Sequence, residues 1–298
     1  MIEPDEGLVR ALLRDQHPDL AERALTAVPG GWDNKMWRLG GDLAVRMPQT
    51  KRAPSLLRSE RRWLPLLAPR LPLPVPTPVR AGEPSTLFPF TWAVVTWVHG
   101  EPADSTPITS PAAGRALARF LAALHQPAPA DAPRNPAHGG PLRRLRDGFD
   151  AGCAAFAQDA SVGALRDVWK RAVAAPAWEG PPLWVHGDLH PANVLVDDGD
   201  LCGVVDFGDL CAGDPAADLA AAWVLLPAGA CAAFLDAYAA ERQLTEATLE
   251  RARGWAAVRA LGLLEVGRKW ELGIAGGKPT WGPAGRAAIQ RLLAWSGA

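Results

Sequence analysis

The chain has 298 residues, of which 48% are hydrophobic, and its formal net charge is −1. This length suffices for one large or two modest domains. The hydrophobic content suffices for a buried core and excludes a disordered chain. The balanced charge gives no overall attraction to nucleic acid or to an anionic membrane, so we expect neither as a partner.

Cysteine usage and the N-terminal residues indicate a cytoplasmic protein. The four cysteines form no C-x-x-C pair, and so few in a chain of this size suggest free thiols in a reducing compartment. The charged first sixteen residues lack the apolar core of a signal peptide. Charged residues, Pro or Gly interrupt every apolar run before it reaches the roughly 18 residues of a membrane span. We expect a monomer or homodimer.

The first hundred residues predict a small antiparallel sheet with one inserted helix. Leucines at roughly helical spacing over residues 4–27 predict two short helices. Residues 27–48 predict three strands, with "GGD" as a hairpin signal. Residues 54–67 again have helical spacing, and the β-branched, aromatic run "FTWAVVTWVHG" predicts a strand.

From Ser110 onward the pattern is mainly helical. Ser110 is the expected N-cap of the first helix, with Pro111 at its first position. Further helices are predicted at 142–157, 161–175, 216–226, 229–241, 245–272 and 283–295. The predicted fold class is therefore α+β, with a small antiparallel-sheet lobe over residues 1–98 and a larger, mainly helical lobe over residues 99–298.

The segment "VHGDLHPANVLV" holds the most specific motif. It places His186, Asp188 and Asn193 in the pattern H-x-D-x-x-x-x-N, and Asp206 opens a "DFG" thirteen residues later. This spacing resembles the catalytic loop and metal-binding motif of protein kinases. The apolar runs "NVLV" and "CGVV", joined by the polar "DDGD", predict a two-stranded hairpin with the motif residues at one end.

Phosphoryl transfer requires this set of side chains. One carboxylate orients the acceptor hydroxyl and receives its proton, a role that fits Asp188. Oxygen ligands hold Mg²⁺ against the nucleotide phosphates, and Asn193 and Asp206 supply such oxygens. Two other interpretations remain: a solvated acidic turn, which accounts only for "DDGD", and a metallohydrolase site built from His186, Asp188 and His190.

The chain resembles the aminoglycoside phosphotransferase family through "VHGDLHPANVLV", "GVVDFG" and "GDPAADLA". The resemblance implies a bilobal protein-kinase-like fold and transfer of the ATP γ-phosphate to a small-molecule hydroxyl, with Mg²⁺. It also implies that the last segment buttresses the catalytic loop, where we expect Asp218 either to cap the following helix or to hydrogen-bond the backbone of the loop. Antibiotics such as aminoglycosides or macrolides are the expected acceptors, and metabolites such as amino alcohols or sugars are the alternative.

The same resemblance predicts a nucleotide site in the first lobe. The segment "PGGWDNKMWRL" is the candidate phosphate loop, with Gly30, Gly31, Asp33 and Asn34, although an ordinary hairpin would look the same. Arg46 occupies the position of the kinase strand lysine, and Glu60 is its expected partner on the following helix. The alternative for Glu60 is a solvent-facing charge in "RSERR".

The segment "VVTWVHG" fits the hinge between the lobes. There the carbonyl of Thr96 and the amide of Val98 would bind the adenine. Because backbone groups carry no side-chain signature, the sequence favours ATP without excluding GTP.

The acceptor site is less specific. His190, Asp209, Trp270 and Glu271 are its candidate residues, because aromatic rings and carboxylates suit a cationic or sugar-bearing molecule. Core packing is the alternative for the tryptophans. The last sixty residues contain no dense acidic run of the kind that would bind a polycation. Since Arg46 departs from the kinase lysine, a catalytically silent kinase-fold binding protein is the second functional hypothesis.

Overall fold

The structure, a computed structural model, describes residues 3–29, 31–227 and 229–295. It divides into two compact units, one reaching His99 and including Val204–Gly208, the other formed by Gly100–Gly203 and the chain from Asp209. In the described part of the chain, no helix is both long and apolar enough to cross a membrane.

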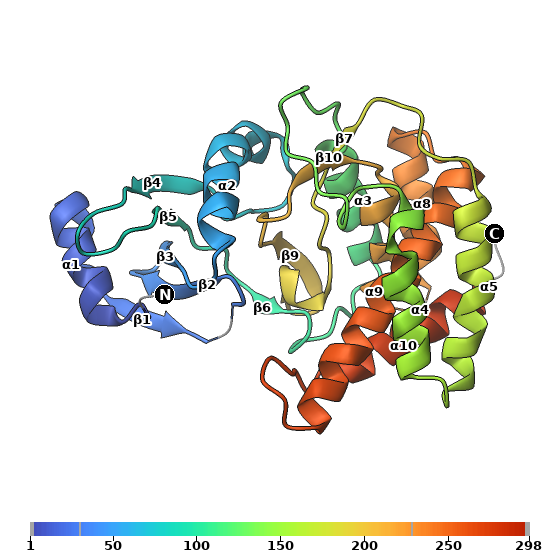
Figure 1. The fold of residues 1–298 in the computed structure, drawn as a ribbon. Coiled ribbons are helices and arrows are strands. Elements are labelled where there is room, and N and C mark those ends of the chain that lie inside the picture. Colours follow the sequence, from blue (N-terminus) through green and yellow to red (C-terminus); the bar gives the residue numbers. More distant parts are fainter. Residues whose placement is uncertain (1–2, 30, 228, 296–298) are drawn as a thin grey trace. The chain divides into compact units, whose positions relative to one another are not determined.

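The first unit contains a five-stranded antiparallel sheet of order β1-β2-β3-β5-β4, as the sequence predicted (Figure 1). Its strands are β1 (Leu25–Val28), β2 (Asn34–Leu39), β3 (Leu43–Pro48), β4 (Pro78–Gly82) and β5 (Trp92–Thr96). The β2–β3 register pairs Met36 with Arg46 across the "GGD" turn. This sheet carries the predicted phosphate loop and the strand arginine.

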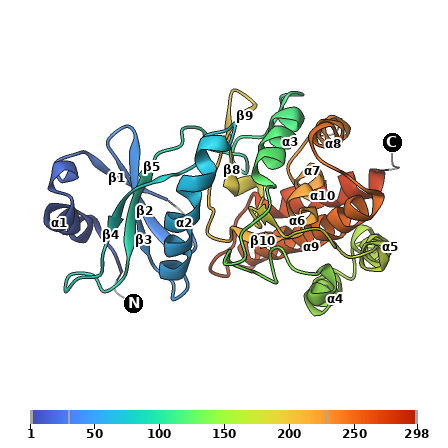
Figure 2. The same ribbon diagram turned by 90° about the horizontal axis from the view of Figure 1, so that it is seen from above.

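Side-chain alternation along β3 divides the sheet into two faces. Val45 and Met47 join one buried cluster with residues of α1 (Glu6–Gln16). Arg46 points to the other face and reaches α2 (Ala53–Leu67). Figure 2 shows α1 and α2 on either side of this sheet. The alternation therefore directs a charged side chain of β3 toward the helix that carries its partner.

The prediction of two helices over residues 4–27 was only partly correct. The helix after α1 is a three-residue 3₁₀ turn, η1 (Pro18–Leu20), and the chain then enters β1 at Leu25. β1 pairs with β2 over Leu25–Val28, and these cross-strand backbone hydrogen bonds outweigh the leucine spacing. A second 3₁₀ turn, η2 (Ala68–Arg70), follows α2.

The second unit is mainly helical, and its longest helix is α9 (Glu246–Glu271), which packs against α10, α5, α6 and α4. The other helices are α3 (Ala113–Leu124), η3 (Leu142–Leu145), α4 (Arg146–Ala155), α5 (Ala160–Ala174), α6 (Ala216–Leu219), α7 (Ala221–Val224), α8 (Ala230–Glu241) and α10 (Trp281–Ala294). All the helices predicted beyond residue 110 form within a few residues of their expected positions, the stretch at 216–226 as two short helices.

The predicted start of the first of these helices was wrong. α3 begins at Ala113, and the hydroxyl of Ser110 accepts only from the amide of Ala112. The amides of Thr109 and Ser110 both donate to the carbonyl of Gly199. These two bonds hold Ser110 against the turn between β8 and β9 and thereby delay the helix.

Two small sheets flank the catalytic-loop motif of the second unit. The predicted hairpin forms as β8 (Val194–Asp197) and β9 (Asp200–Val204), joined by β6 (Glu101–Pro102) in the order β6-β8-β9. The "DDGD" turn is tight, with positive φ at Asp198 and Gly199. β7 (Leu183–Val185) pairs with β10 (Cys211–Gly213), so the catalytic-loop motif starts directly after a paired strand.

Candidate active site

Backbone hydrogen bonds to a buried carboxylate fix the start of the catalytic loop. Asp218 of α6 accepts from the amide of His186 at 2.7 Å and from the amide of Gly187 at 2.9 Å. This confirms the sequence expectation that Asp218 supports the loop. Gly187 has a φ of +84°, and a Cβ there would lie 2.8 Å from the carbonyl oxygen of Asp209. The loop therefore requires glycine at this position.

Asp218 stays ionised despite being completely buried. Burial favours the neutral acid, but a hydrogen bond from His125, the electrostatic interaction with the imidazoles of His125 and His186, and the amide of Gly187 outweigh it. Together they hold the pKa of Asp218 below its usual value. His125 is itself fixed, because its Nδ1 lies 2.7 Å from the hydroxyl of Tyr238.

Asp188 lies among three basic side chains, and its carboxylate is 31% exposed. Arg259 of α9 donates to its Oδ1 at 3.3 Å, and the Nε2 of His190 lies 3.5 Å from its Oδ2. The Nδ1 of His138 lies 3.9 Å from Oδ1. Burial alone would raise the pKa of Asp188, but these three groups together lower it well below the usual value. The carboxylate therefore accepts hydrogen bonds and has an open side.

Sequence reasoning missed Arg259 and His138. Arg259 also donates to the carbonyl of Gly187, and His138 contacts the same carbonyl through Nδ1 at 2.9 Å. Neither residue stands at a fixed spacing from the motif, because each reaches it through tertiary packing. No signal in the sequence could have selected them from the other basic residues.

Asn193 follows Asp188 on η4 (Pro191–Asn193) and is buried. Its Nδ2 donates to the carbonyl of Asp188 at 2.9 Å, and its amide donates to the carbonyl of His190. With the nitrogen engaged, Oδ1 is the atom of this side chain that suits a metal. An amide oxygen is a hard donor, so Asn193 fits Mg²⁺ in chemistry.

Asp206 belongs to the first unit and has an unusual backbone. Its φ is +61°, a conformation that residues with a Cβ rarely adopt, and its side chain is 57% exposed. The Nη2 of Arg46 lies 3.8 Å from its Oδ1. Strained backbone of this kind is concentrated at functional sites. An exposed carboxylate beside a cation also fits a metal ion bound together with phosphate.

Arg46 and Glu60 form the buried ion pair that the sequence predicted. Their side chains are 6% and 1% exposed, and the Nη1 of Arg46 donates to Oε2 of Glu60. Burial disfavours the charge on Arg46, but Glu60 and Asp206 outweigh it and raise the arginine's pKa. The solvent-facing alternative for Glu60 is therefore wrong.

The predicted phosphate loop lies between β1 and β2, with Gly30 outside the described residues. Gly31 has a φ of +84°, and a Cβ there would meet the carbonyl oxygen of Asn34 at 2.3 Å. Asp33 accepts from Thr50 at 2.5 Å and from Arg52 at 2.7 Å. Asp33 thus braces the turn, while the glycine lets the backbone close tightly.

The hinge candidates lie at and just beyond the end of β5. The amide of Thr96 donates to the carbonyl of Thr77, and Leu43 is opposite Thr96 in the sheet. The amide of Val98 has no hydrogen-bond partner within the described part of the chain. It is therefore a donor that a ligand could use.

The four acceptor candidates have different environments. Trp270 is 56% exposed at the end of α9, and Glu271 beside it is also exposed. His190 contacts Asp188 and packs against Trp281, with ring centroids 4.7 Å apart. Asp209 is buried and accepts from the Nδ2 of Asn135 at 3.0 Å, which favours a structural role for it.

The metallohydrolase interpretation finds no support. Within the described residues, no group of three or more His, Cys, Asp or Glu side chains could hold a metal ion. His186 is fully buried, and its Nδ1 accepts from the amide of Asp188 at 3.2 Å. It therefore packs beneath the loop.

Solved structures of phosphotransferases share this α+β, protein-kinase-like fold. The GDP and kanamycin complex of APH(2″)-IIia has a TM-score of 0.70 at 18% identity, over 96% of this chain and 98% of that one. Apo macrolide 2′-phosphotransferase MphH from Brachybacterium faecium has a TM-score of 0.63 at 25% identity, over 99% and 100%. Among curated protein sequences, none matches.

The fold and the two motifs thus define a kinase-like phosphotransferase. The model of the APH phosphotransferase enzyme family matches residues 24–261, and the chain belongs to that family. This confirms the resemblance that the motifs carried.

Proposed function

We propose that this phosphotransferase moves the γ-phosphate of a nucleoside triphosphate, ATP or GTP, to a hydroxyl of an antibiotic of the macrolide kind. The observation that carries the proposal is the state of Asp188. Its carboxylate is ionised, held by Arg259 and His190, and open on one side. An anion in this setting orients an acceptor hydroxyl and receives its proton late in the transfer.

The other motif residues take roles around the phosphates. Residues 1–98, with Asp206, form the nucleotide-binding lobe, and residues 99–298 form the catalytic and substrate-binding lobe. Asn193 and Asp206 would hold Mg²⁺, which supplies charge neutralisation at the phosphates. Arg46 keeps its guanidinium in place through Glu60 and directs its remaining donors toward a phosphate.

Backbone groups bind the nucleotide base in this proposal. The unpartnered amide of Val98 donates to the base, and the carbonyl of Thr96 accepts from it. The proposal includes both ATP and GTP as phosphate donors, because one structure of similar fold contains GDP and another contains ATP. Gly31, with Asp33 and Asn34 shaping the turn, lets the backbone approach the phosphates.

The surroundings of Asp188 favour an apolar acceptor over a polycation. Arg259, His138 and His190 place positive or protonatable groups beside the carboxylate, which disfavours a ligand of several ammonium groups. The end of α9 exposes Trp270, 56%, and the chain after α9 exposes Leu272, 61%, and Ile274, 51%. These side chains suit a large hydroxylated molecule with an apolar face, and the similarity to a macrolide 2′-phosphotransferase supports this class.

The test is a phosphorylation screen in which ATP and GTP are each combined with macrolides, aminoglycosides, amino alcohols and sugars. We expect turnover with a macrolide, and Asp188→Ala should abolish it while keeping nucleotide-dependent thermal stabilisation. Asp206→Ala should lose the stabilisation that Mg²⁺ and nucleotide give together. Turnover of an amino alcohol or a sugar, with no turnover of any antibiotic, would show that the acceptor is a metabolite and not a macrolide. Normal turnover by both variants would contradict the site assignment, and wild-type nucleotide binding without any turnover would favour a silent binding protein.

A further inference from the structure

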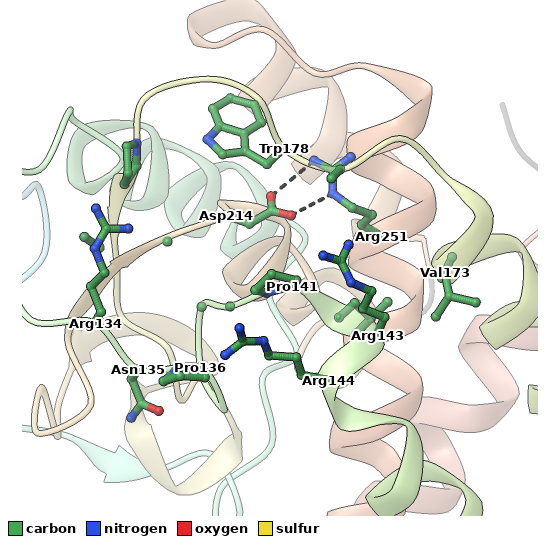
Figure 3. A pocket seen from close by; sticks show the side chains of 18 of the residues that line it. Arg134, Asn135, Pro136, Pro141, Arg143, Arg144, Val173, Trp178, Asp214 and Arg251 are labelled. Carbon is green, nitrogen blue, oxygen red and sulfur yellow. Dashed lines mark hydrogen bonds and ion pairs between the residues drawn. The ribbon is translucent and has the colours of Figure 1, made fainter.

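A cavity of about 340 Å³ lies within the second unit, and none of the candidate active-site residues lines it. Its walls come from residues 134–144, residues 172–182, residues 212–214 and Arg251 of α9 (Figure 3). Small-molecule pockets in proteins span roughly 300–1,000 Å³, so this cavity would hold one compact molecule.

Three arginines give the cavity an uncompensated positive charge. The side chains of Arg134, Arg143 and Arg144 line it, are exposed, and form no ion pair or hydrogen bond with any described residue. The fourth lining arginine, Arg251, is different, because it donates to Asp214 at 2.7 and 3.2 Å. Figure 3 shows that pair as dashed lines, with Arg134 across the cavity from Arg143 and Arg144.

The charge is a local feature and does not follow from the composition. The whole chain is nearly neutral, with 31 basic and 32 acidic residues. Asp214 is the only carboxylate among the lining residues, and Arg251 already neutralises it. Guanidinium groups stay charged at any physiological pH, and like charges around one cavity repel each other unless an anion joins them.

Much of the remaining lining is apolar. Pro136, Pro141, Leu142 and Val173 contribute to the walls, and Trp178 covers one side. The indole Nε1 of Trp178 donates to the carbonyl of Pro181 at 3.0 Å, which anchors the ring. A ligand would therefore meet charged donors on two sides and apolar surface between them.

We propose that this cavity binds a small organic polyanion whose phosphate or carboxylate groups pair with Arg134 on one side and with Arg143 and Arg144 on the other. The planar fork of arginine binds either kind of group through two parallel hydrogen bonds. The carbon skeleton of the ligand rests on Trp178 and the prolines. This binding is independent of the transfer reaction proposed above.

Residues of the cavity wall also contact the segments that support the catalytic loop. Ligand binding should therefore be measurable through thermal stability as well as through calorimetry. Asn135, which lines the cavity, donates to Asp209, and His138 contacts the carbonyl of Gly187. The carbonyl of Gly139, another lining residue, accepts from the amide of Asp214 at 3.0 Å. An anion bound to Arg134 would restrain this segment and raise the temperature of unfolding.

Calorimetric titration of the full chain, without nucleotide or Mg²⁺, tests the proposal with citrate and pyrophosphate as separate probes. We expect one ion of at least one probe to bind per chain, and binding to weaken at least tenfold in R143Q/R144Q. The matched control is R115Q/R119Q, which removes two exposed, unpaired arginines of α3 outside the cavity. It should bind as the wild type does. A citrate response assigns carboxylates as the ligand class, and a pyrophosphate response assigns phosphates.

A second variant, R134Q, removes charge from the opposite wall and should weaken binding on its own. Thermal unfolding verifies that each variant is folded, and the probe should raise the unfolding temperature of the wild type and of the control only. The proposal is wrong if neither probe binds the wild type. It is equally wrong if R143Q/R144Q and R134Q bind as the wild type does, or if the control loses as much affinity as they do.

Discussion

Arg259, which lies on α9 and 71 residues further along the chain, donates a hydrogen bond to the carboxylate of Asp188. The same guanidinium donates to the carbonyl of Gly187, so one side chain holds both the motif aspartate and the backbone before it. Arg259 is thus a positioning residue, and it also helps to keep the carboxylate ionised.

Arg259→Gln should lower kcat by about ten- to a hundredfold, because a misplaced carboxylate cannot orient the acceptor hydroxyl. The KM for the nucleotide should change less than twofold, and Arg259→Lys should recover part of kcat because it keeps the charge. Steady-state kinetics measure the split. The control is Arg268→Gln on the same helix, where the arginine pairs with Glu265. A rise in nucleotide KM as large as the fall in kcat would contradict the positioning role.

The buried pair of Arg46 and Glu60 separates stability from function. Arg46→Met should destabilise the fold by about 3–5 kcal/mol, because it leaves Glu60 as an uncompensated buried charge. The double variant R46M/E60L should recover most of that stability, since apolar side chains can replace a buried pair. Urea unfolding measures the stabilities.

Nucleotide binding should not recover in the double variant, because the guanidinium that faces Asp206 is absent. Binding of the Mg²⁺–nucleotide complex measures this. Nucleotide affinity equal to the wild type in R46M/E60L would show that Arg46 serves stability alone.

The sequence was sufficient to predict those candidate-site residues whose arrangement depends on their spacing along the chain. Asp188 and Asn193 come from one loop, and Asp206 comes from the end of the hairpin that follows, so their spacing carries the signal. The pair of Arg46 and Glu60 was predictable too, since strand alternation directs one and helical spacing the other. Local geometry fixes each of these residues within its own unit.

The rest depends on long-range packing, which spacing does not encode. Arg259 and His138 reach Asp188 only because α9 and the loop before η3 pack beside it. β7 and β10 pair although residues 186–210, which include both motifs, lie between them in the sequence. Each strand has only three residues, which is too short for a recognisable alternation of apolar and polar side chains. Ser110 looked like a helix cap, but its amide is bound to the carbonyl of Gly199.

Asp218 predicts a specific dependence of stability on pH. Its folded-state pKa lies below the usual value of an aspartate, so its charge stabilises the fold at pH values well above 4. That contribution is lost as the pH falls below about 4 and through the folded-state pKa. Asp218→Asn should therefore cost about 3–5 kcal/mol at pH 7, because it removes one charge of a buried hydrogen-bonded set.

The difference between the wild type and Asp218→Asn should narrow between pH 6 and pH 3. Urea unfolding at several pH values measures it. The exposed Asp236 on α8 provides the control, and Asp236→Asn should change stability little at any pH. A difference that stayed constant down to pH 3 would argue against an ionised Asp218 in the folded protein.

The apolar segment after α9 predicts how the acceptor binds. The amide of Lys278 donates to the carbonyl of Val266, which folds residues 272–280 back along the helix, and the segment ends at Trp281. Trp281 packs on His190, the neighbour of Asp188. Leu272 and Ile274 therefore belong to a segment that is connected by contacts to the carboxylate of Asp188.

The variant L272S/I274S should raise the KM for a macrolide about tenfold or more, because covering a Leu or Ile side chain is worth about 1.5–3 kcal/mol. The nucleotide KM should stay the same, since the change affects only the acceptor. Leu293, 38% exposed on α10, offers a matched control, and L293S should leave both constants unchanged. An unchanged macrolide KM in L272S/I274S would place the acceptor elsewhere on the second unit. An equal rise of the macrolide KM in L272S/I274S and L293S would indicate a general effect of losing apolar surface. The exposed side chains after α9 would then no longer support a macrolide as the acceptor.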